Sequence, residues 1–320
     1  GTSCDIPIAG ITIDANDVEL DLNNYTLSQQ TDMNDEPIKI HTVGVKINPG
    51  IENVTIHNGT IEKIGSMGIY AKASPGSNIS TILIENMTIR LCGRNSFVSN
   101  GLQYGVPCGQ TVFFANTCGA IGLFGLMNGF TPLAFVKKFV IRNCRLLDYG
   151  MIVGTDNIGV SLISVIDGII ENCIIKGENP IPNGLTGASG VDGFGVIFAE
   201  DLLVSNCEIS DINGLGVYAT AIKYIFVNRF EILDTFISNV FQTGTLDPLI
   251  LQGLVTAVNA TGIKLLSSPN GVITNCTVNK VFSDLVVNDV GLSASAQGML
   301  ITESDNIRVE NCNVSGITFA

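Results

Sequence analysis

Short windows of the chain alternate between apolar and polar residues. In "VTIHN" the apolar positions are Val54 and Ile56, and the same spacing recurs at Ile82 and Ile84. A period of two predicts strands with one buried face, and helical spacing is absent almost everywhere. Strands this short, separated by turns and without crossover helices, predict a solenoid whose coils stack about 4.8 Å apart.

A longer unit repeats over this alternation. It starts with Gly and a short apolar strand, crosses a few turn residues, and ends in a second strand that carries Asn, as in "IGVSLISVIDGIIENCII". Gly159 and Asn172 are 13 residues apart in that copy, and the other copies range from 11 to 18. Cys follows the Asn in five copies, namely "FVIRNCRLL", "GIIENCIIKG", "LLVSNCEIS", "GVITNCTVN" and "IRVENCNVS". A match across so many segments indicates a repeat architecture.

These units resemble the right-handed parallel β-helix, the pectin-lyase-like superfamily. The opening "ITIDANDVELDLNNYTLS" is similar to the first coils of that superfamily, where "LDLNG-x-TL" is familiar, although Asn24 replaces its Gly. The resemblance covers nearly the whole chain. It implies an all-β fold: a single-stranded right-handed parallel β-helix with irregular loop insertions. It leaves function open, because that fold hosts lyases, hydrolases, adhesins and viral spikes.

The recurring Asn and the residue after it are candidates for a structural ladder. An inward Asn at a turn of a β-helix can bond its amide to the Asn of the coils above and below. The predicted ladder is Asn58, Asn86, Asn143, Asn172, Asn206, Asn228, Asn275 and Asn311. The following residue varies, which favours a small buried group over a reagent, because free Cys commonly behaves as a small hydrophobe. Stacked disulfides and a reactive site remain as alternatives.

The repeat predicts one β-helix domain over residues 1–320. Residues 1–30 form its N-terminal cap and first coil, and residues 92–138 form an irregular excursion rich in Gly and aromatic residues. Loops are expected near 178–193, 235–258 and 281–296, with a short helix from Pro248 to Ala257. One disulfide among Cys92, Cys108 and Cys118 is a further alternative. Loops on one wall of a solenoid usually build its binding surface.

Charge and composition restrict the partners. The net charge is −13 and the few basic residues are scattered, so nucleic acid and anionic membranes are poor partners. No apolar run reaches the length of a membrane span. The chain has two His and no C-x-x-C pair, which makes a zinc site improbable. We expect neither a metal nor a cofactor.

Two aspartates are the candidate catalytic residues. Asp156 and Asp192 each lie three residues before the Gly of a unit. On consecutive coils they would face each other at about 5 Å, as acid and nucleophile or as acid and base. Asp167, Asp201 and Asp211 are possible contributors, and Lys223 or Tyr218 could bind sugar. The alternative is that these are ordinary turn residues, since Asp before Gly is typical of turns.

The resemblance implies two further patterns. Enzymes of the superfamily that act on polygalacturonate use carboxylates on adjacent coils, often with a nearby His and a basic residue. Lyases of this fold use Arg or Lys as base, commonly with Ca²⁺ held by Asp. The Gly-His-Gly and Arg-Ile-Lys motifs of the superfamily are missing here, which weakens a catalytic interpretation.

The leading hypothesis is therefore a structural or attachment protein: a β-helical fibre, spike or surface component of a virus or cell, located outside the cell and able to bind a polysaccharide or glycan. The alternative is a carbohydrate-active enzyme, either a glycoside hydrolase or a polysaccharide lyase. The sequence ends just past a repeat strand, so we expect either further chain beyond Ala320 or a covering partner. Self-association as a homotrimer or fibre is the expected assembly.

Overall fold

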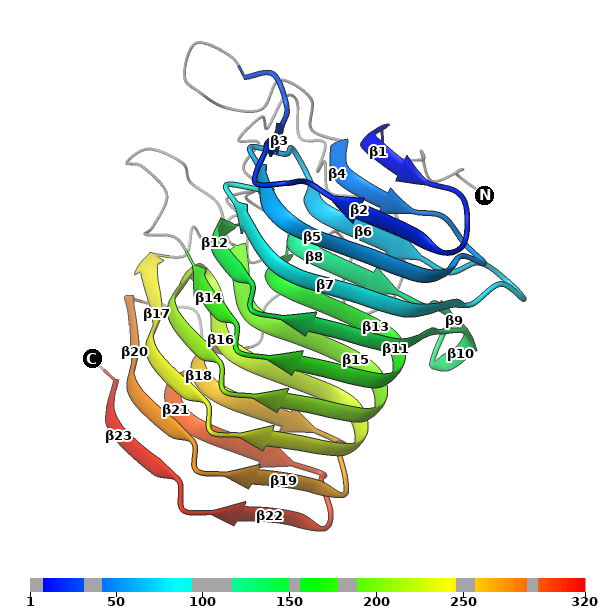
Figure 1. Ribbon diagram of the computed structural model, residues 1–320. Coiled ribbons are helices and arrows are strands. Elements are labelled where there is room, and N and C mark those ends of the chain that lie inside the picture. The colour runs from blue at the N-terminus through cyan, green and yellow to red at the C-terminus, as the bar shows by residue number, and fades with distance from the viewer. Residues whose placement is uncertain are drawn as a thin grey trace.

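The computed structural model describes residues 8–31, 42–93, 117–149, 156–177, 189–245, 257–286 and 293–319. These residues form one 21-stranded sheet and a separate two-stranded hairpin, and every pairing within the large sheet is parallel. Figure 1 shows the sheet wound into a stack of coils that runs from the N-terminal end to the C-terminal end. The predicted fold class, a parallel β-helix, is confirmed.

Each coil contributes strands to three faces. Face one consists of β1 (Ile8–Ile13), β4 (Thr42–Ile47), β6 (Met67–Lys72), β8 (Thr117–Phe124), the first part of β13 (Asp156–Glu171) and of β15 (Ser189–Ser205), the middle of β16 (Glu208–Leu233), β18 (Ala257–Leu266) and β21 (Ser293–Thr302). Face two consists of β2 (Val18–Asp21), the first part of β5 (Glu52–Glu62) and of β7 (Ile79–Arg90), β11 (Val136–Arg142), the last parts of β13, β15 and β16, β19 (Gly271–Thr274) and β22 (Ile307–Glu310). Face three consists of β3 (Thr26–Ser28), the last parts of β5 and β7, β12 (Arg145–Tyr149), β14 (Ile174–Gly177), the first part of β16, β17 (Phe236–Thr245), β20 (Thr277–Val286) and β23 (Asn313–Phe319).

The interior is filled by columns of aliphatic side chains in register. Ile69, Ile121 and Val160 occupy the same position on successive coils, and all three are fully buried. Glycines make room for aromatic rings in such columns, as Gly168 does for Phe139 and Gly271 for Phe230. A Cβ on Gly271 would lie 2.0 Å from Cζ of Phe230 on the preceding coil, so the ring extends along the stack where a side chain would otherwise stand.

The recurring Asn residues form the corner between faces two and three. Asn172, Asn206 and Asn275 have φ values of 55°, 49° and 54°, which is left-handed backbone that Asn tolerates better than most residues. Their side chains are exposed, so the prediction of an inward ladder is wrong. Because the backbone reverses its alternation at this corner, Asn points out and the next residue points in.

Side-chain bonding along this corner is sparse. Asn86 donates to Asn58 at 3.4 Å and Asn275 donates to Asp234 at 3.0 Å. Asn228 does not belong to the column, because it pairs with Glu200 near the other end of face two. Asp234, with a φ of 48°, takes the place that was predicted for Asn228.

The residue after the corner forms the buried column. Cys144, Cys173 and Cys276 are each 1% exposed, and each thiol donates weakly to backbone carbonyls, as Cys173 does to Glu171 at 3.3 Å. Thr235 fills the same position and donates to Leu233 at 2.9 Å. The cysteines that the structure describes are free thiols, namely Cys92, Cys118, Cys144, Cys173, Cys207, Cys276 and Cys312. Cys144, Cys173 and Cys276 therefore act as small buried groups, as the structural interpretation of the Asn-Cys pair predicted.

Several predicted irregular segments contain regular strands. Residues 117–138, inside the expected excursion, contribute β8, the start of β11 and the antiparallel hairpin of β9 (Leu126–Asn128) and β10 (Thr131–Ala134). The expected loops at 235–258 and 281–296 contain β17 and parts of β18, β20 and β21. Cys108 and most of the predicted helix, residues 248–256, lie outside the described residues.

Face one differs from the other faces in being buried on its outer side as well. Tyr70, Phe124, Ile163, Ile197 and Ile225 point away from the solenoid interior into a second apolar cluster, and none is more than 6% exposed. Strands buried on both sides read as near-continuous apolar runs. This explains why the alternation is weakest in "GVSLISVI" and "GVIFA".

Candidate functional site

The two predicted catalytic aspartates lie on adjacent coils of face one but not at the same position. Asp156 pairs with Gly190, and Asp192 pairs with Ile158. The expected face-to-face arrangement is therefore offset by two residues. The side chain of Asp156 lies outside the described residues. The catalytic assignment of Asp156 and Asp192 stays a prediction.

Asp192 belongs to a buried ionic cluster on the outer side of face one. Its carboxylate is fully buried and contacts Lys223, with 2.6 Å between Oδ2 and Nζ. The Lys223 ammonium also donates to the Tyr218 hydroxyl at 3.1 Å and lies 4.2 Å from the centre of that ring. Lys223 and Tyr218, which were predicted to bind sugar, thus do assemble with Asp192, although the group is enclosed.

The surroundings of this cluster shift two pKa values. Burial, reinforced by the charge of Asp192, raises the pKa of Tyr149 well above its ordinary value, and its hydroxyl donates to the Asp192 carbonyl at 3.1 Å. Lys264 is the neighbour of Lys223 on the next coil. Burial and then the charge of Lys223 lower the pKa of Lys264, while Asp192 opposes that change. Low-dielectric surroundings thus dominate this part of face one.

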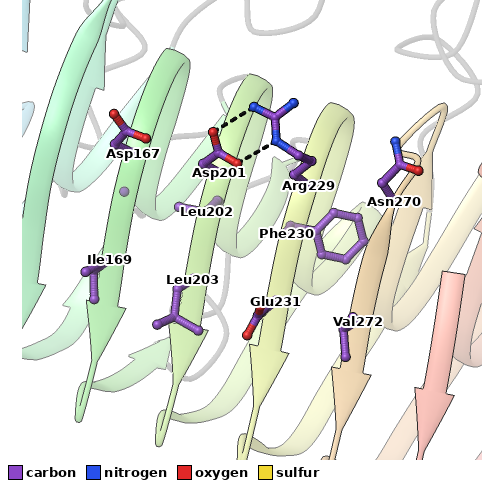
Figure 2. Close-up of a pocket in the computed structure, with 11 residues that line it drawn as sticks. Asp167, Ile169, Asp201, Leu202, Leu203, Arg229, Phe230, Glu231, Asn270 and Val272 are labelled. Carbon is purple, nitrogen blue, oxygen red and sulfur yellow. Dashed lines mark hydrogen bonds and ion pairs between the residues drawn. The ribbon is translucent and has the colours of Figure 1, made fainter. Parts of the chain in front are cut away.

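A second site is an open groove on face two, with a volume of about 530 Å³. Figure 2 shows Asp167, Asp201, Arg229 and Asn270 along one edge, one residue from each of four successive coils. The exposed side of the strands supplies a floor that includes the apolar side chains of Ile169, Leu203 and Val272. An apolar floor with a polar rim is the usual composition of a ligand site.

Arg229 neutralises one carboxylate of this edge. Its guanidinium donates two hydrogen bonds to Asp201, at 2.7 and 2.8 Å, and contacts Glu200 at 2.7 Å. The hydrogen bonds from Arg229 lower the pKa of Asp201 and raise that of Arg229. Because the pair is exposed, its main effect is to fix the geometry of the edge. Asp201 is therefore held ionised and is a poor general acid.

Three phenylalanines lie at the corner between faces one and two, outside the set of residues that line the groove. Phe198 and Phe226 stack with their ring centres 4.8 Å apart, and Phe130 at the tip of the β9–β10 hairpin contacts both rings edge-on, at 6.3 and 6.0 Å. Phe130 is 57% exposed. Phe198 and Phe226 each precede a groove residue by three positions, Asp201 and Arg229 respectively. We call this set the aromatic corner.

The backbone of the aromatic corner is strained. Phe198 and Phe226 have φ values of 55° and 57°, a region in which a bulky residue is an outlier. Ser164, Ser267 and Glu303 hold equivalent left-handed positions on other coils. Such strain costs on the order of 1–3 kcal/mol per residue and tends to persist at binding sites.

Sequence reasoning identified part of this surface. Asp167 and Asp201 were named as contributors, and both lie five residues before a corner Asn. Arg229 was missed because Asn228 was assigned to the corner between faces two and three. Asp234 holds that corner position instead, and it lies five residues after Arg229, the same interval that separates Asp167 and Asp201 from their corner Asn. The aromatic corner was missed because no feature of the local sequence indicates that Phe198 and Phe226 adopt left-handed backbone.

Two general findings accompany these sites. Within the described ranges, no group of three or more His, Cys, Asp and Glu side chains is placed to hold a metal ion. The described residues also include no helix of the length and apolarity that crossing a membrane requires.

The stacked parallel coils define a β-solenoid, and sequence comparison identifies its family. The family model described as the right handed beta helix region matches residues 128–320, and the chain belongs to this family. The comparison with curated protein sequences found no match.

Solved structures of related architecture are distant. A glycoside hydrolase is 11% identical with a TM-score of 0.36, over 79% of this chain and 51% of that one, so the chain spans about half its length. The periplasmic alginate epimerase AlgG is 11% identical with a TM-score of 0.29, over 85% and 77% of the two chains. The Dettilon tailspike protein is 12% identical with a TM-score of 0.26, over 93% and 56%. These likenesses concern the fold alone.

Proposed function

We propose that the protein is a structural or attachment component, a β-helical fibre, spike or surface protein, that binds neutral glycans where the aromatic corner meets the face-two groove. The observation that carries this proposal is the exposed Phe130 ring, packed on Phe198 and Phe226, which precede the groove residues Asp201 and Arg229 by three positions. Such a protein acts outside the cell, at a cell or virion surface.

A sugar ring matches this surface chemically. Its apolar C–H face can lie against an aromatic ring, while its hydroxyls exchange hydrogen bonds with carboxylates, guanidinium and amides. Asp167, Asp201, Arg229 and Asn270 supply those groups along one edge at the spacing of the coils, about 4.8 Å. A linear oligosaccharide can therefore contact several coils at once.

The charge of the groove favours a neutral ligand. Among the described residues that line it, Asp167, Asp201 and Glu231 are acidic and Arg229 is the one cation. The whole chain carries a net charge of −13, which also repels polyanions. Acidic polysaccharides should thus bind more weakly than neutral ones, and more so at low salt.

The competing function is a carbohydrate-active enzyme, and it rests on the assembly of Asp192, Lys223 and Tyr218. Against it, Asp192 is fully buried and ion-paired, whereas a catalytic carboxylate must reach a glycosidic oxygen. If the wild type cleaves a polysaccharide and an Asp192→Asn variant does not, the enzyme hypothesis is favoured. If the wild type binds a polysaccharide without cleaving it, the attachment hypothesis is favoured.

The test is a panel of neutral and acidic polysaccharides, measured for both retention of the protein and release of reducing ends. We expect retention on at least one neutral glycan without release of reducing ends. Phe130→Ala should weaken that binding about tenfold or more, consistent with loss of about 1.4 kcal/mol. Phe236→Ala is the matched control, because that ring is 43% exposed on face three, away from the groove.

Two outcomes would overturn the proposal: equal binding by Phe130→Ala and the wild type, or the release of sugar by the wild type. Self-association as a homotrimer or fibre belongs to the same proposal. Light scattering of the purified chain tests it, and a stable monomer at all concentrations would contradict it.

A further inference from the structure

Four sulfur atoms occupy one interior column on four successive coils, just after the corner between faces two and three. They belong to Met87, Cys144, Cys173 and Cys207, whose flanking residues pair in register from coil to coil. Backbone bonds also link the column, because the residues after Cys173 and Cys207 donate to the carbonyls of Cys144 and Cys173, each at 2.9 Å. All four side chains are at most 3% exposed. The solenoid interior therefore contains a buried line of soft ligand atoms.

The three thiols of this sulfur column interact directly with one another. Hydrogen bonds from Cys144 and then from Cys207 lower the pKa of Cys173. The hydrogen bond with Cys173, followed by burial, raises the pKa values of Cys144 and Cys207. Cys173 thus holds the central sulfur, which has a thiol on either side along the stack axis and loses its proton most readily of the three.

The spacing of the sulfur column matches a two-coordinate metal ion. Coils lie about 4.8 Å apart, and a metal–thiolate bond is about 2.3 Å long, the value for zinc, so a linear sulfur–metal–sulfur unit spans about 4.6 Å. Side chains in register leave the backbone in the same direction, so the lone pairs of neighbouring sulfurs can face each other along the stack axis. A disulfide fits less well, because the two Cβ–S bonds of a disulfide diverge.

We propose that the sulfur column binds one Cu(I) ion between the sulfur of Cys173 and the sulfur of Cys144 or Cys207. Thiolate and thioether sulfurs are the soft ligands that select Cu(I). The ion replaces the proton of Cys173, which leaves to water, and the second thiol binds through a lone pair with its own proton in place. Copper enters and remains as Cu(I), so no electron is transferred. One positive charge enters and one leaves, so the apolar interior gains no net charge.

Zinc fits the sulfur column less well. It takes four ligands in a tetrahedron, whereas these thiols lie along one line. Within the described ranges, no group of three or more His, Cys, Asp and Glu side chains is placed to hold a metal ion, but a two-coordinate ion needs only two sulfurs. The sequence-based expectation of no metal rests on the absence of zinc motifs, which do not bear on such an ion.

The ion has a short route to the sulfur column. Asn172, the residue before Cys173, is exposed at the corner, so a single residue separates this thiol from solvent along the chain. Local opening of such a corner belongs to the ordinary fluctuations of a native protein. The column lies inside the solenoid, whereas the glycan groove lies on the outer side of face two. The two proposals therefore stand or fall independently.

Anaerobic titration of the full chain with Cu(I), buffered by a coloured chelator, tests the site. At the lowest free Cu(I) concentration that saturates the wild type, Cys173→Thr should bind one equivalent fewer, because Cys144 and Cys207 lie about 9.6 Å apart, two coil spacings. Met87 beside Cys144 offers a neutral sulfur, so a residual site there should be at least about tenfold weaker. Thr is chosen because Thr235 fills this position on another coil and is 1% exposed. Cys173→Ala covers the case in which the first variant folds poorly.

Cys144→Thr and Cys207→Thr are the discriminating variants. Each leaves Cys173 with one neighbouring thiol, so each should bind as many equivalents as the wild type. Cys92→Ser is the matched control, because Cys92 is a free and fully buried thiol outside the sulfur column, and it should also bind as the wild type does. The remaining cysteines are common to all variants, so the measured quantity is the difference in bound copper.

Thermal unfolding supplies a second readout, which requires the ion to bind the native state. Cu(I) should raise the Tm of the wild type by several degrees more than that of Cys173→Thr, since a ligand stabilises the state that it binds more tightly. Equal copper uptake by Cys173→Thr and the wild type would overturn the proposal. An equal loss in Cys173→Thr, Cys144→Thr and Cys207→Thr would also overturn it, because that is the pattern of thiols that bind copper singly. A fall in the wild-type Tm would have the same consequence, because it would show that Cu(I) prefers the thiols of the unfolded chain.

Discussion

The corner between faces two and three makes a sharp prediction about Asn172. This residue has a φ of 55° and an exposed side chain, and its backbone N–H donates to the Ser205 carbonyl at 3.1 Å. If its role is to adopt left-handed backbone, then Gly should replace it well and Ala should not. If its role is to bond an amide along the stack, then both substitutions should be equally harmful.

The magnitude follows from the backbone. Left-handed geometry costs an ordinary L-residue about 1–2 kcal/mol, a penalty that Asn partly and Gly wholly avoids. We therefore expect Asn172→Ala to lower the free energy of unfolding by about 1 kcal/mol. For Asn172→Gly we expect a change within about 0.5 kcal/mol, because relief of strain offsets the greater entropy of unfolded Gly.

Asn275 provides the comparison, because its amide does donate to Asp234 at 3.0 Å. Asn275→Gly should lose about 0.5–1 kcal/mol more than Asn172→Gly, the usual net value of one hydrogen bond. Urea unfolding followed by circular dichroism measures the three variants and the wild type, provided that the slope with denaturant stays constant. An Asn172→Gly variant as unstable as Asn172→Ala would refute the argument.

Three further predictions concern the interior. Gly271→Ala should destabilise the protein by about 1–3 kcal/mol, because the added Cβ would lie 2.0 Å from Phe230 Cζ, and calorimetry that showed no loss would contradict the packing. Thr235→Cys should change the unfolding free energy by less than about 1 kcal/mol, because this position belongs to the thiol column; a loss above about 2 kcal/mol would refute that equivalence. Burial raises the pKa of Cys276 from 9.0 to about 11, so its contribution is fully present below pH 9 and is lost as the pH rises toward 11. Urea midpoints between pH 8 and 11 should therefore fall less steeply for Cys276→Thr than for the wild type, and identical slopes would contradict the assignment.

The repeat pattern predicted the architecture because a β-helix places the same residue types at the same position on every coil. Alternation of apolar residues and the periodic Gly and Asn were sufficient for the fold class. The direction of the Asn was wrong because alternation across a corner depends on backbone geometry. A left-handed residue reverses the pattern, which sends Cys173 inward and Asn172 outward.

The candidate site was harder to predict because it depends on register and on exceptions to the repeat. Asp156 and Asp192 hold the same place relative to the unit Gly, yet Asp192 pairs with Ile158. The aromatic corner joins Phe130 of a local hairpin to Phe198 and Phe226, and no repeat spacing connects Phe130 to the other two residues. A periodic sequence pattern predicts contacts between equivalent residues of the coils, and it does not predict contacts between a hairpin outside the repeat and those coils.

The most direct test of the proposed function is equilibrium titration of the wild-type protein with a neutral oligosaccharide selected from the panel, with analysis of the recovered sugar. Phe130→Ala is titrated in parallel. The proposal predicts saturable binding by the wild type, binding at least tenfold weaker in Phe130→Ala, and sugar recovered unchanged. Identical affinities, or shortened or unsaturated sugar products, would contradict it.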